Sequence, residues 1–463
     1  MRVPDRLQTS FVLFAAVLAG MLAVVAAVKG GTILLGAVAL SAVAVALIGL
    51  SIRPQDLFVL WLLAAPFLQD VGQGRAQHLA RILFFSSPPL LFGARALLER
   101  RPVRGSFVDV FPAAYFLFVV ASVVITGSSI SVTQLFSIVG IGVLVYYFCA
   151  FAPLGEGIEQ RVLRVLLVTS IIVAVITLIG RLGGLKFGYT ADTSSNVARA
   201  TGPLGDPVYL GTFLGVGFVV ALAILVWSGP SALRRLSLVA VVVTPVAIFL
   251  TLTRGPIIAA AVVGSLILFG RRGSRWGAVV AVAAAAIVVV ALWGSIASTS
   301  LYKDRFSNKT NVQARVLIDQ WSFTLAGRKP ILGWGYGSFD RVKNSANLSS
   351  GSLPRAFGLN YTSHNTFLTI LVELGGAGLL LLLVPWLSAV TSGRRLLTAT
   401  PEASWLVVAL LGTIGVWVVN AGTVDMRFFP FAWVLPWVAV GLLRRRVLDV
   451  QSIEREPIEA LRS

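Results

Sequence analysis

The chain has 463 residues, of which 57% are hydrophobic and only 12% are charged. Its mean hydropathy of +0.88 excludes an ordinary soluble domain. The net charge of +19 does not indicate a nucleic-acid-binding protein. The arginines form short clusters between apolar stretches, where membrane topology and anionic lipid headgroups account for them. The single cysteine, Cys149, excludes an intramolecular disulfide and a cysteine metal site.

Apolar stretches long enough to cross a bilayer core of about 30 Å recur along the whole chain. Without water in that core, each must be a helix that satisfies its own backbone. We therefore expect an all-α polytopic membrane protein with one integral membrane domain over residues 1–463. The stretch 57–68 is short enough to be re-entrant, which leaves 12–14 transmembrane helices. In chain order the candidate spans are 11–28, 32–52, 57–68, 82–98, 107–127, 133–153, 163–180, 208–227, 236–252, 255–270, 277–293, 366–390, 402–421 and 428–443.

The basic residues between the spans predict the orientation of the protein. If every candidate span crosses, both termini share one side. That side carries nineteen Lys and Arg residues against eight on the other, with the loop 294–363 left aside. The positive-inside rule places the richer side, and thus both termini, in the cytoplasm. The loop 294–363, the loop 181–207 and Arg254 are then expected to face outward.

The long polar loop 294–363 breaks this charge pattern, since it places nine Lys and Arg residues but only three acidic residues on the outer side. Within it, residues 312–326 have apolar side chains at helical spacing and predict an amphipathic helix. Pro330, followed by the three alternate glycines of Gly333–Gly337, predicts a tight turn. A basic loop on the outer side indicates an anionic ligand.

His364 is expected at the outer entrance of the span 366–390, with Ser363 as the helix cap. A histidine there is either a structural residue at the membrane interface or a general base or hydrogen-bond donor. The second role suits an imidazole because its ordinary pKa is near 6.5.

Two arginines are further candidates for chemistry. Arg254 lies in a very short outer turn, and Pro256 can open the helix that follows, so the side chain is close to exposed helix N–H groups that favour an anion. The alternative is an arginine that extends to lipid headgroups. Arg315, on the predicted loop helix, lies either on a solvated face or in a second clamp on a phosphate or diphosphate, whose oxygens match the guanidinium fork.

Five short motifs follow one another over residues 199–380. They are Gly202-Pro-Leu-Gly-Asp-Pro-Val-Tyr-Leu210, Thr253-Arg254-Gly255, Ala314-Arg315 before Trp321, Pro330-Ile-Leu-Gly-Trp-Gly-Tyr-Gly-Ser-Phe339, and His364-Asn365-Thr-Phe-Leu368 followed by Glu373-Leu-Gly375 and Gly378. In this order they resemble the motifs of the O-antigen ligase and polysaccharide polymerase superfamily. Two of them depart from the family pattern, with Thr253 in place of Ser and Asp206 in place of Asn, and the first 190 residues show only general similarity.

The resemblance implies a metal-independent glycosyltransferase with a membrane-embedded fold of the GT-C type and no cofactor. Such an enzyme moves a glycan from an undecaprenyl diphosphate carrier to an acceptor hydroxyl at the outer face of the bacterial cytoplasmic (inner) membrane. The acceptor is a lipid A-type core for a ligase, or another lipid-linked glycan for a polymerase, and both remain open. The family's catalytic histidine corresponds to His364 and its two arginines correspond to Arg254 and Arg315.

Other outer-side residues are candidates for substrate binding at a lower rank: Arg199, Asp206, Arg75, Arg81, Arg427, Trp334 and Asn365. No metal site is expected, because the outer acidic residues are scattered without paired spacing. Glu373 follows His364 by nine residues, so the two point to different helix faces, and we expect Glu373 to form an interhelical hydrogen bond. The alternative function is a flippase or exporter of lipid-linked oligosaccharide, which needs polar groups along a transbilayer path.

Overall fold

The computed structural model describes residues 53–68, 105–128, 130, 132–182, 189–192, 197–270, 310–345, 363–428 and 430–460. Six helices in these ranges are long and apolar enough to cross a membrane, and three further apolar helices are shorter. The chain is therefore an all-α polytopic membrane protein, as its composition predicts. The candidate spans 11–28, 32–52, 82–98 and 277–293 lie outside the described residues.

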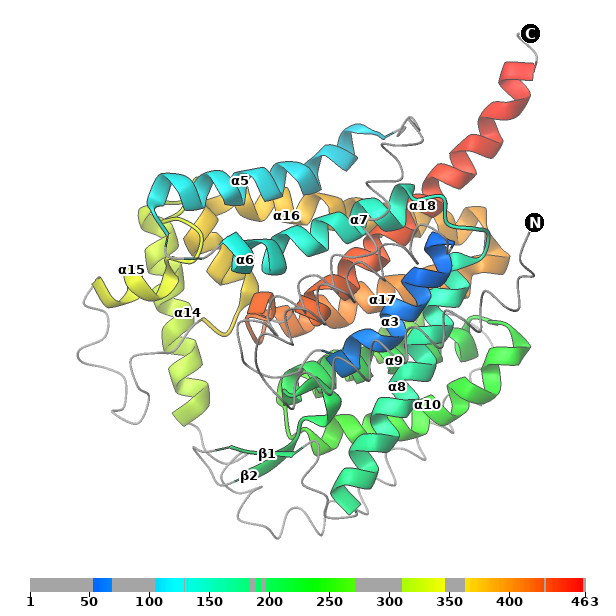
Figure 1. Ribbon diagram of the computed structural model, residues 1–463, viewed down its shortest axis with the longest axis horizontal. Coiled ribbons are helices and arrows are strands. Elements are labelled where there is room, and N and C mark those ends of the chain that lie inside the picture. Colours follow the sequence, from blue (N-terminus) through cyan, green and yellow to red (C-terminus); the bar gives the residue numbers. More distant parts are fainter. Residues whose placement is uncertain are drawn as a thin grey trace, which may run out of the picture.

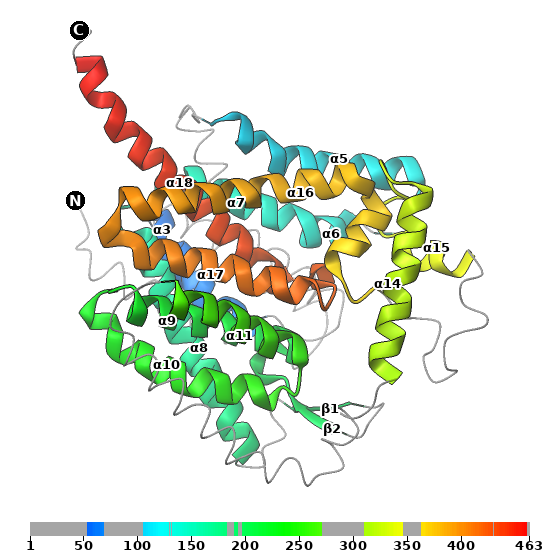
Figure 2. The same cartoon turned by 180° about the vertical axis from the view of Figure 1, so that it is seen from behind.

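Each of the other predicted spans is a helix (Figures 1 and 2), and most ends lie within a few residues of those expected. The exceptions are α16, which continues to Ala399 where we expected an end at 390, and α18, which continues to Ala460 where we expected an end at 443. The span predicted at 133–153 contains a π-turn, η2, between two α-helical parts. The helices of the bundle and the short turns next to them are α3 (Pro54–Leu68), η1 (Phe107–Asp109), α5 (Val110–Thr126), α6 (Val132–Leu135), η2 (Phe136–Gly140), α7 (Ile141–Phe151), α8 (Ile158–Leu182), η3 (Gly202–Leu204), α9 (Pro207–Val226), α10 (Ser231–Leu250), α11 (Arg254–Phe269), α16 (Thr366–Ala399), η5 (Pro401–Ala403), α17 (Ser404–Ala421), η6 (Met426–Phe428) and α18 (Pro430–Ala460).

Helix α9 forms the centre of one half of the bundle. It is buried along nearly its whole length and packs against α8, α10, α11 and α17. Its sequence is apolar all round, which is the pattern of a helix enclosed by other helices. Gly211 brings α9 very close to the start of α11, because a Cβ atom at this position would lie 2.6 Å from two atoms of Pro256.

Four buried tryptophans fill the other half of the core. Trp386, Trp417, Trp433 and Trp437 come from α16, α17 and α18 and meet in edge-to-face pairs with centroids 4.6–6.4 Å apart. Such pairs stabilise a core beyond the area they bury. Cys149 is also buried in this packing, as expected, and is free.

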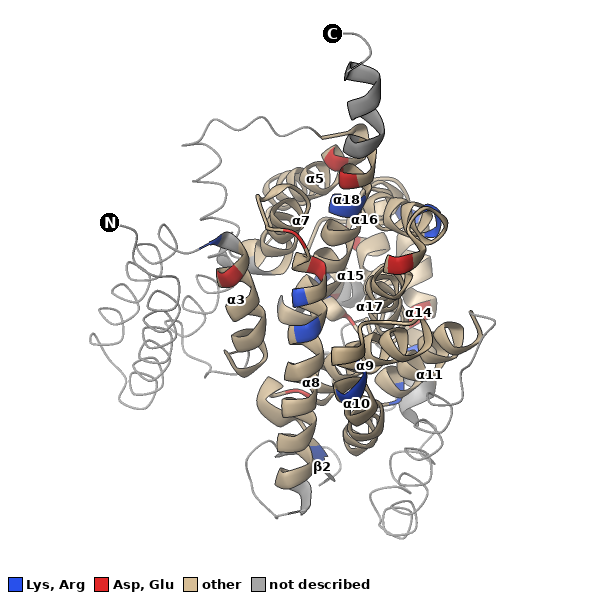
Figure 3. Ribbon diagram, turned by 90° about the vertical axis from the view of Figure 1, so that its right-hand side faces the viewer, with Lys and Arg blue, Asp and Glu red and all other residues tan. Residues whose placement is uncertain are grey.

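A buried ion pair joins α18 to the start of α5. Arg444 donates to the Asp109 carboxylate at 2.8 Å, and Tyr146 on α7 donates to the same carboxylate at 2.5 Å. The next residue, Arg445, donates to the carbonyl oxygens of Ala152 and Leu154, just after α7. In Figure 3 the basic segments of α8, α10, α16 and α18 gather at the end of the bundle that faces the viewer.

Two elements of the predicted outer loops lie at the other end of the bundle. Helix α14 (Thr310–Arg328) runs crosswise to α5 and α16, and Figures 1 and 2 agree on this. It includes the amphipathic helix expected at 312–326, and its buried face packs on α15 (Phe339–Ser345) and on Val372 of α16. The second element was not expected: the loop 181–207 contains an antiparallel hairpin of β1 (Tyr189–Asp192) and β2 (Val197–Ala200).

Helix α16 is broken at Gly375, whose φ of 65° and ψ of −169° are not helical. Residues 376–399 alone exceed the roughly 20 residues needed to cross a bilayer, so 366–374 form a separate half-helix at the α14 end. Gly375 lets the loop approach the break, because a Cβ atom there would lie 2.2 Å from the carbonyl oxygen of Ile331.

The glycine-rich turn supplies the hydrogen bonds that the broken helix lacks. All three glycines of the predicted turn have positive φ, which glycine adopts at little cost. The segment 330–335 can therefore run along the break and pair with its backbone. The bonds are Trp334 N to Val372 O, Gly335 N to Glu373 O, Gly376 N to Pro330 O, and Ala377 N to Ile331 O, at 2.7–3.1 Å.

Candidate functional site

The connection between α17 and α18, residues 420–427, is the centre of the candidate site. Thr423 lies beside Gly255 at the start of α11, since a Cβ atom at Gly255 would be 2.4 Å from the Thr423 hydroxyl oxygen. Arg315 of α14 donates to the Thr423 carbonyl oxygen at 3.5 Å. Thr366, two residues after His364, donates to the Val424 carbonyl. Three segments that are far apart in the sequence therefore meet on one short connection.

His364 is held just before the half-helix of α16. Asn365 is the residue that caps this helix, because its side-chain oxygen accepts from the backbone N–H groups of Phe367 and Leu368. Our assignment of the cap to Ser363 is therefore wrong. The Ser363 hydroxyl accepts from the Asn365 N–H instead and shapes the turn that contains His364. The role of Asn365 in this structure is to start the helix.

His364 is half-buried, and its surroundings favour the neutral imidazole. Burial and the nearby Arg315 cation lower the pKa of His364 from 6.5 to about 4, and the Asp425 carboxylate opposes them. A neutral imidazole has one nitrogen that can accept a proton. Arg315 is thus close enough to His364 to influence its protonation.

Arg315 is exposed on α14, on the side of the helix that faces the 420–427 connection. The helix is fixed beneath it by Ile318, Trp321 and Leu325, which are buried against α15 and α16. A residue on this helix therefore has a defined position relative to His364, whereas an arginine on an irregular loop would not.

Arg254 is the first residue of α11, as the turn and Pro256 predict. Before it, Leu252 has a φ of 50°, which is uncommon for a residue with a branched side chain. Thr253 occupies the N-cap position, yet its side chain makes no cap hydrogen bond to the helix. The first N–H groups of α11 thus lie next to the half-buried Arg254 without the usual threonine cap.

Two of the lower-ranked candidates, Arg199 and Asp206, have protein partners in the structure. Arg199 on β2 donates to the Thr251 carbonyl at 3.2 Å and to the Thr253 hydroxyl at 2.5 Å. Asp206 caps α9 by accepting from the N–H groups of Val208 and Tyr209. Asp206 also favours the charged form of Arg199. Both residues therefore build the scaffold around the start of α11.

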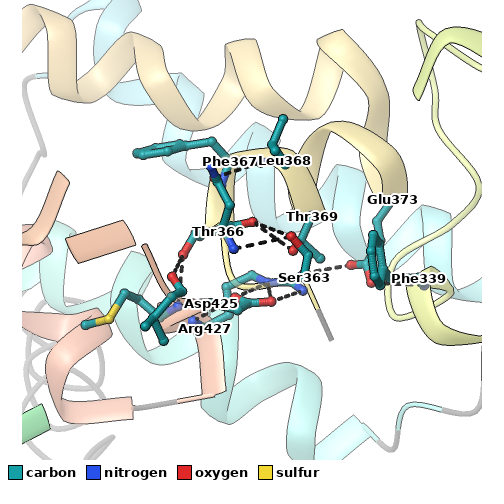
Figure 4. Close-up of polar contacts among 12 residues, drawn as sticks. Phe339, Ser363, Thr366, Phe367, Leu368, Thr369, Glu373, Asp425 and Arg427 are labelled. Atoms are coloured by element: carbon teal, nitrogen blue, oxygen red, sulfur yellow. Dashed lines mark hydrogen bonds and ion pairs between the residues drawn. The ribbon is translucent and has the colours of Figure 1, made fainter. Parts of the chain in front are cut away.

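Arg427 is buried and belongs to an ion-pair network, shown in Figure 4. It donates to Glu373 at 2.6 Å and to Asp425 at 2.7 Å, and its guanidinium lies 5.2 Å from the centre of the Tyr336 ring. Glu373 also accepts from the backbone N–H of Phe339 and so bonds between elements, as expected. Removing one partner of a buried pair typically costs about 3–5 kcal/mol. The structure therefore gives Arg427 a structural position, where we expected it in a substrate groove.

Trp334 also has a structural position. Its indole N–H donates to the carbonyl oxygen of Leu325 near the end of α14, and Lys329 lies 4.3 Å from its ring centre. The ring thus fastens the glycine-rich turn to the loop helix. Arg75 and Arg81 lie outside the described residues.

The residues that sequence reasoning missed are those of the α17–α18 connection, above all Thr423 and Asp425. Threonine does not indicate chemistry on its own, Asp425 is one of several scattered acidic residues, and no motif marks either of them. The available signal is the group of polar residues between Asn420 and Arg427, in a short connection between two apolar spans. Within the described ranges, no group of three His, Cys, Asp or Glu side chains gathers in a way that would hold a metal ion.

Part of the chain is similar to a known protein family. Residues 238–383 match the model of the family described as O-antigen ligase, and the match supports membership of the chain in the O-antigen ligase and polymerase family. The matched region begins in α10 and ends in α16, and so contains Arg254, Arg315 and His364. No curated protein matches the chain.

Proposed function

We propose that this member of the O-antigen ligase family is a glycosyltransferase that takes a glycan from an undecaprenyl diphosphate donor. It transfers the glycan to an acceptor hydroxyl at the outer face of the bacterial cytoplasmic membrane. The observation that carries the proposal is that the segments holding His364, Arg254 and Arg315, which are up to 110 positions apart, all contact residues 420–427. The family match supports the general activity, and the site supports its chemistry.

The two arginines fit the leaving group of this reaction. The acceptor oxygen attacks the anomeric carbon of the donor sugar, and the bond from that carbon to the diphosphate oxygen breaks. Negative charge then develops on the lipid diphosphate. Arg254, with the N–H groups at the start of α11, and Arg315 can stabilise that charge because they are already in position before the reaction.

His364 fits the other half of the reaction, in which the acceptor hydroxyl loses a proton. With a pKa of about 4 the imidazole is neutral at pH 7 and can accept a hydrogen bond from that hydroxyl. A bound diphosphate places negative charge beside Arg315 and offsets the cation that disfavours protonation of His364. Donor binding therefore raises the pKa of His364 and makes it a stronger base at the moment of transfer.

The geometry does not separate a ligase from a polymerase, since both use the same donor and differ only in the acceptor. It gives less support to a flippase or exporter. Such a protein needs polar groups along a path through the bilayer. The candidate residues instead lie at one end of the helices, and the described core beyond them is filled by the four tryptophans.

The test is transfer by the purified protein in proteoliposomes with a lipid-linked glycan donor and a lipid-linked acceptor. Wild-type protein should form product and release undecaprenyl diphosphate in equal amounts. His364→Ala should lose about 100-fold or more in turnover, the range of a positioned acid or base, while it inserts in the membrane normally. Near-normal product from His364→Ala would contradict the proposed chemistry.

A further inference from the structure

Arg199 contacts the turn that precedes Arg254 at two points. Its Nε donates to the Thr251 carbonyl at 3.2 Å and its Nη2 donates to the Thr253 hydroxyl at 2.5 Å. The guanidinium therefore spans both ends of a three-residue turn. The middle residue of that turn, Leu252, has the positive φ of 50°. A non-glycine residue in this conformation costs free energy and persists when its surroundings hold it.

The second of these bonds engages the Thr253 side chain, which occupies the N-cap position of α11. A threonine there normally accepts a hydrogen bond from the N–H group of the second or third helical residue. The third residue of α11 is Pro256, which has no N–H group. The Thr253 hydroxyl instead donates to the Thr251 carbonyl at 3.0 Å and accepts from Arg199, so it holds the turn and Arg199 together.

The rest of the motif that follows Arg199 supports the same turn. Asp206, at the start of α9, favours the charged form of Arg199. Five residues later, Gly211 packs on Pro256 of α11, where a Cβ atom would lie 2.6 Å from the ring. Hairpin, helix cap and glycine therefore all act on the first turn of α11.

We infer that Arg199 is a positioning residue for the diphosphate site: it fixes the turn that precedes Arg254 and thereby the direction in which Arg254 meets the donor's diphosphate. This inference rests on the proposed function, since it assigns the diphosphate to the start of α11. It differs from direct binding of substrate by Arg199, because its effect passes through Thr253 and Arg254.

The experiment measures the affinity of the purified full-length protein for undecaprenyl diphosphate and its turnover with lipid-linked donor. Arg199→Gln should weaken binding and lower turnover by about 10- to 100-fold, the effect of a misplacement near 1 Å. Thr253→Val, which removes the same hydrogen bond and leaves Arg199 in place, should do likewise. Thr253→Ser keeps the hydroxyl and should remain near wild type. Arg235→Gln, an exposed arginine of α10, is the control for loss of a positive charge.

Combined variants separate positioning from direct contact. The double variant Arg199→Gln/Thr253→Val should bind undecaprenyl diphosphate as tightly as the single variant of lower affinity, because both substitutions remove the same hydrogen bond. In an Arg254→Ala background, Arg199→Gln should have no further effect on affinity. If Arg199→Gln lowered the affinity equally in the wild-type and Arg254→Ala proteins, Arg199 would contact the diphosphate directly, and the inference would be overturned. If Arg199→Gln does not fold, wild-type affinity of Thr253→Val overturns it.

The outcomes also distinguish this inference from the proposed function. If Arg254→Ala binds undecaprenyl diphosphate and transfers glycan as wild type does, the diphosphate site itself is wrong. If Arg254→Ala loses binding and transfer while Arg199→Gln and Thr253→Val retain both activities, only the positioning role of Arg199 is wrong.

Discussion

The Nη1 atom of Arg315 lies 3.5 Å from the carbonyl oxygen of Thr423, so the loop helix α14 contacts the α17–α18 connection directly. This contact brings a residue of the long polar loop to the segment that also touches Gly255 and Thr366. The loop is thereby part of the site and does not merely cover it.

Arg254→Lys and Arg315→Lys should each lower turnover at least about 10-fold although the charge is kept. An ammonium group is a single point charge on a flexible chain and cannot reproduce two parallel N–H bonds to a diphosphate. Turnover is measured with purified variants in proteoliposomes. Arg394→Lys, an exposed residue near the far end of α16, is the matched control and should behave as wild type. Full activity of both lysine variants would remove the arginine clamp from the mechanism.

Transfer should continue at an undiminished rate in excess EDTA. The proposed site stabilises the leaving diphosphate with Arg254, Arg315 and helix N–H groups, and this basic surrounding repels a divalent cation. The measurement is product formation by purified protein before and after chelation, with a magnesium-dependent enzyme treated alongside as the control. Activity that disappears with EDTA and returns with added magnesium would direct attention to Asp206 and Asp319 as ligands.

His364 should titrate near pH 4 in the folded, donor-free protein. Burial comes first and the Arg315 cation second among the causes that lower its pKa. The chain has only two histidines, so the imidazole NMR signals of a His78→Gln variant report His364 alone. Arg315→Gln should raise the observed pKa toward 6.5. A titration near 6.5 in both variants would show that His364 is solvated.

The same shift predicts how stability depends on pH. The folded pKa lies below the unfolded value of 6.5, so the unfolded chain takes up a proton first as the pH falls. The contribution of His364 to stability is therefore lost progressively from about pH 6.5 to pH 4 and stays constant below that. In detergent, the unfolding temperature of wild type should therefore fall relative to that of His364→Gln between pH 7.5 and pH 4.5.

Gly375→Ala should destabilise the protein, whereas Gly376→Ala should be nearly silent. Alanine at 375 would need a φ of 65° with a ψ of −169°, a region that is essentially confined to glycine and costs other residues about 1–3 kcal/mol, and its Cβ would lie 2.2 Å from the Ile331 carbonyl oxygen. At Gly376 the φ is not in this region, and the nearest neighbour is the Pro330 carbonyl oxygen at 3.4 Å. Thermal unfolding in detergent compares the two. Equal unfolding temperatures would mean that the break in α16 closes without penalty.

The membrane helices were predictable because hydropathy depends only on local composition. The loop helix at 310–328 was equally predictable from its apolar spacing, and the three turn glycines from their sequence. The break at Gly375 was not, since Glu373 and the Gly375-Gly376 pair are only short interruptions in an apolar stretch that has the length of a single span. It depends on a partner some forty residues earlier, and single-sequence patterns do not report such pairs.

The candidate site was predictable in part for a related reason. His364, Arg254 and Arg315 belong to residue types whose chemistry is evident in isolation. For Arg199 and Arg427 the same reasoning suggested substrate contact. In the structure Arg199 bonds to the Thr251–Thr253 turn, and Arg427 pairs with two carboxylates. A charged residue's type indicates what it can bind, and only the fold decides which partner it meets.

The pairing of segment 330–335 with the break in α16 bears on how the protein is made. Until that segment docks, the backbone groups on both sides of Gly375 lack their partners, and such groups are costly in a lipid environment. The segment precedes α16 in the chain, so ribosomal synthesis delivers it first. With the loop outside, it has already been translocated when α16 leaves the insertion machinery. The order of synthesis therefore matches the order of folding that this helix requires, and a circular permutant that placed 330–335 after α16 would have to insert a span whose stabilising segment did not yet exist.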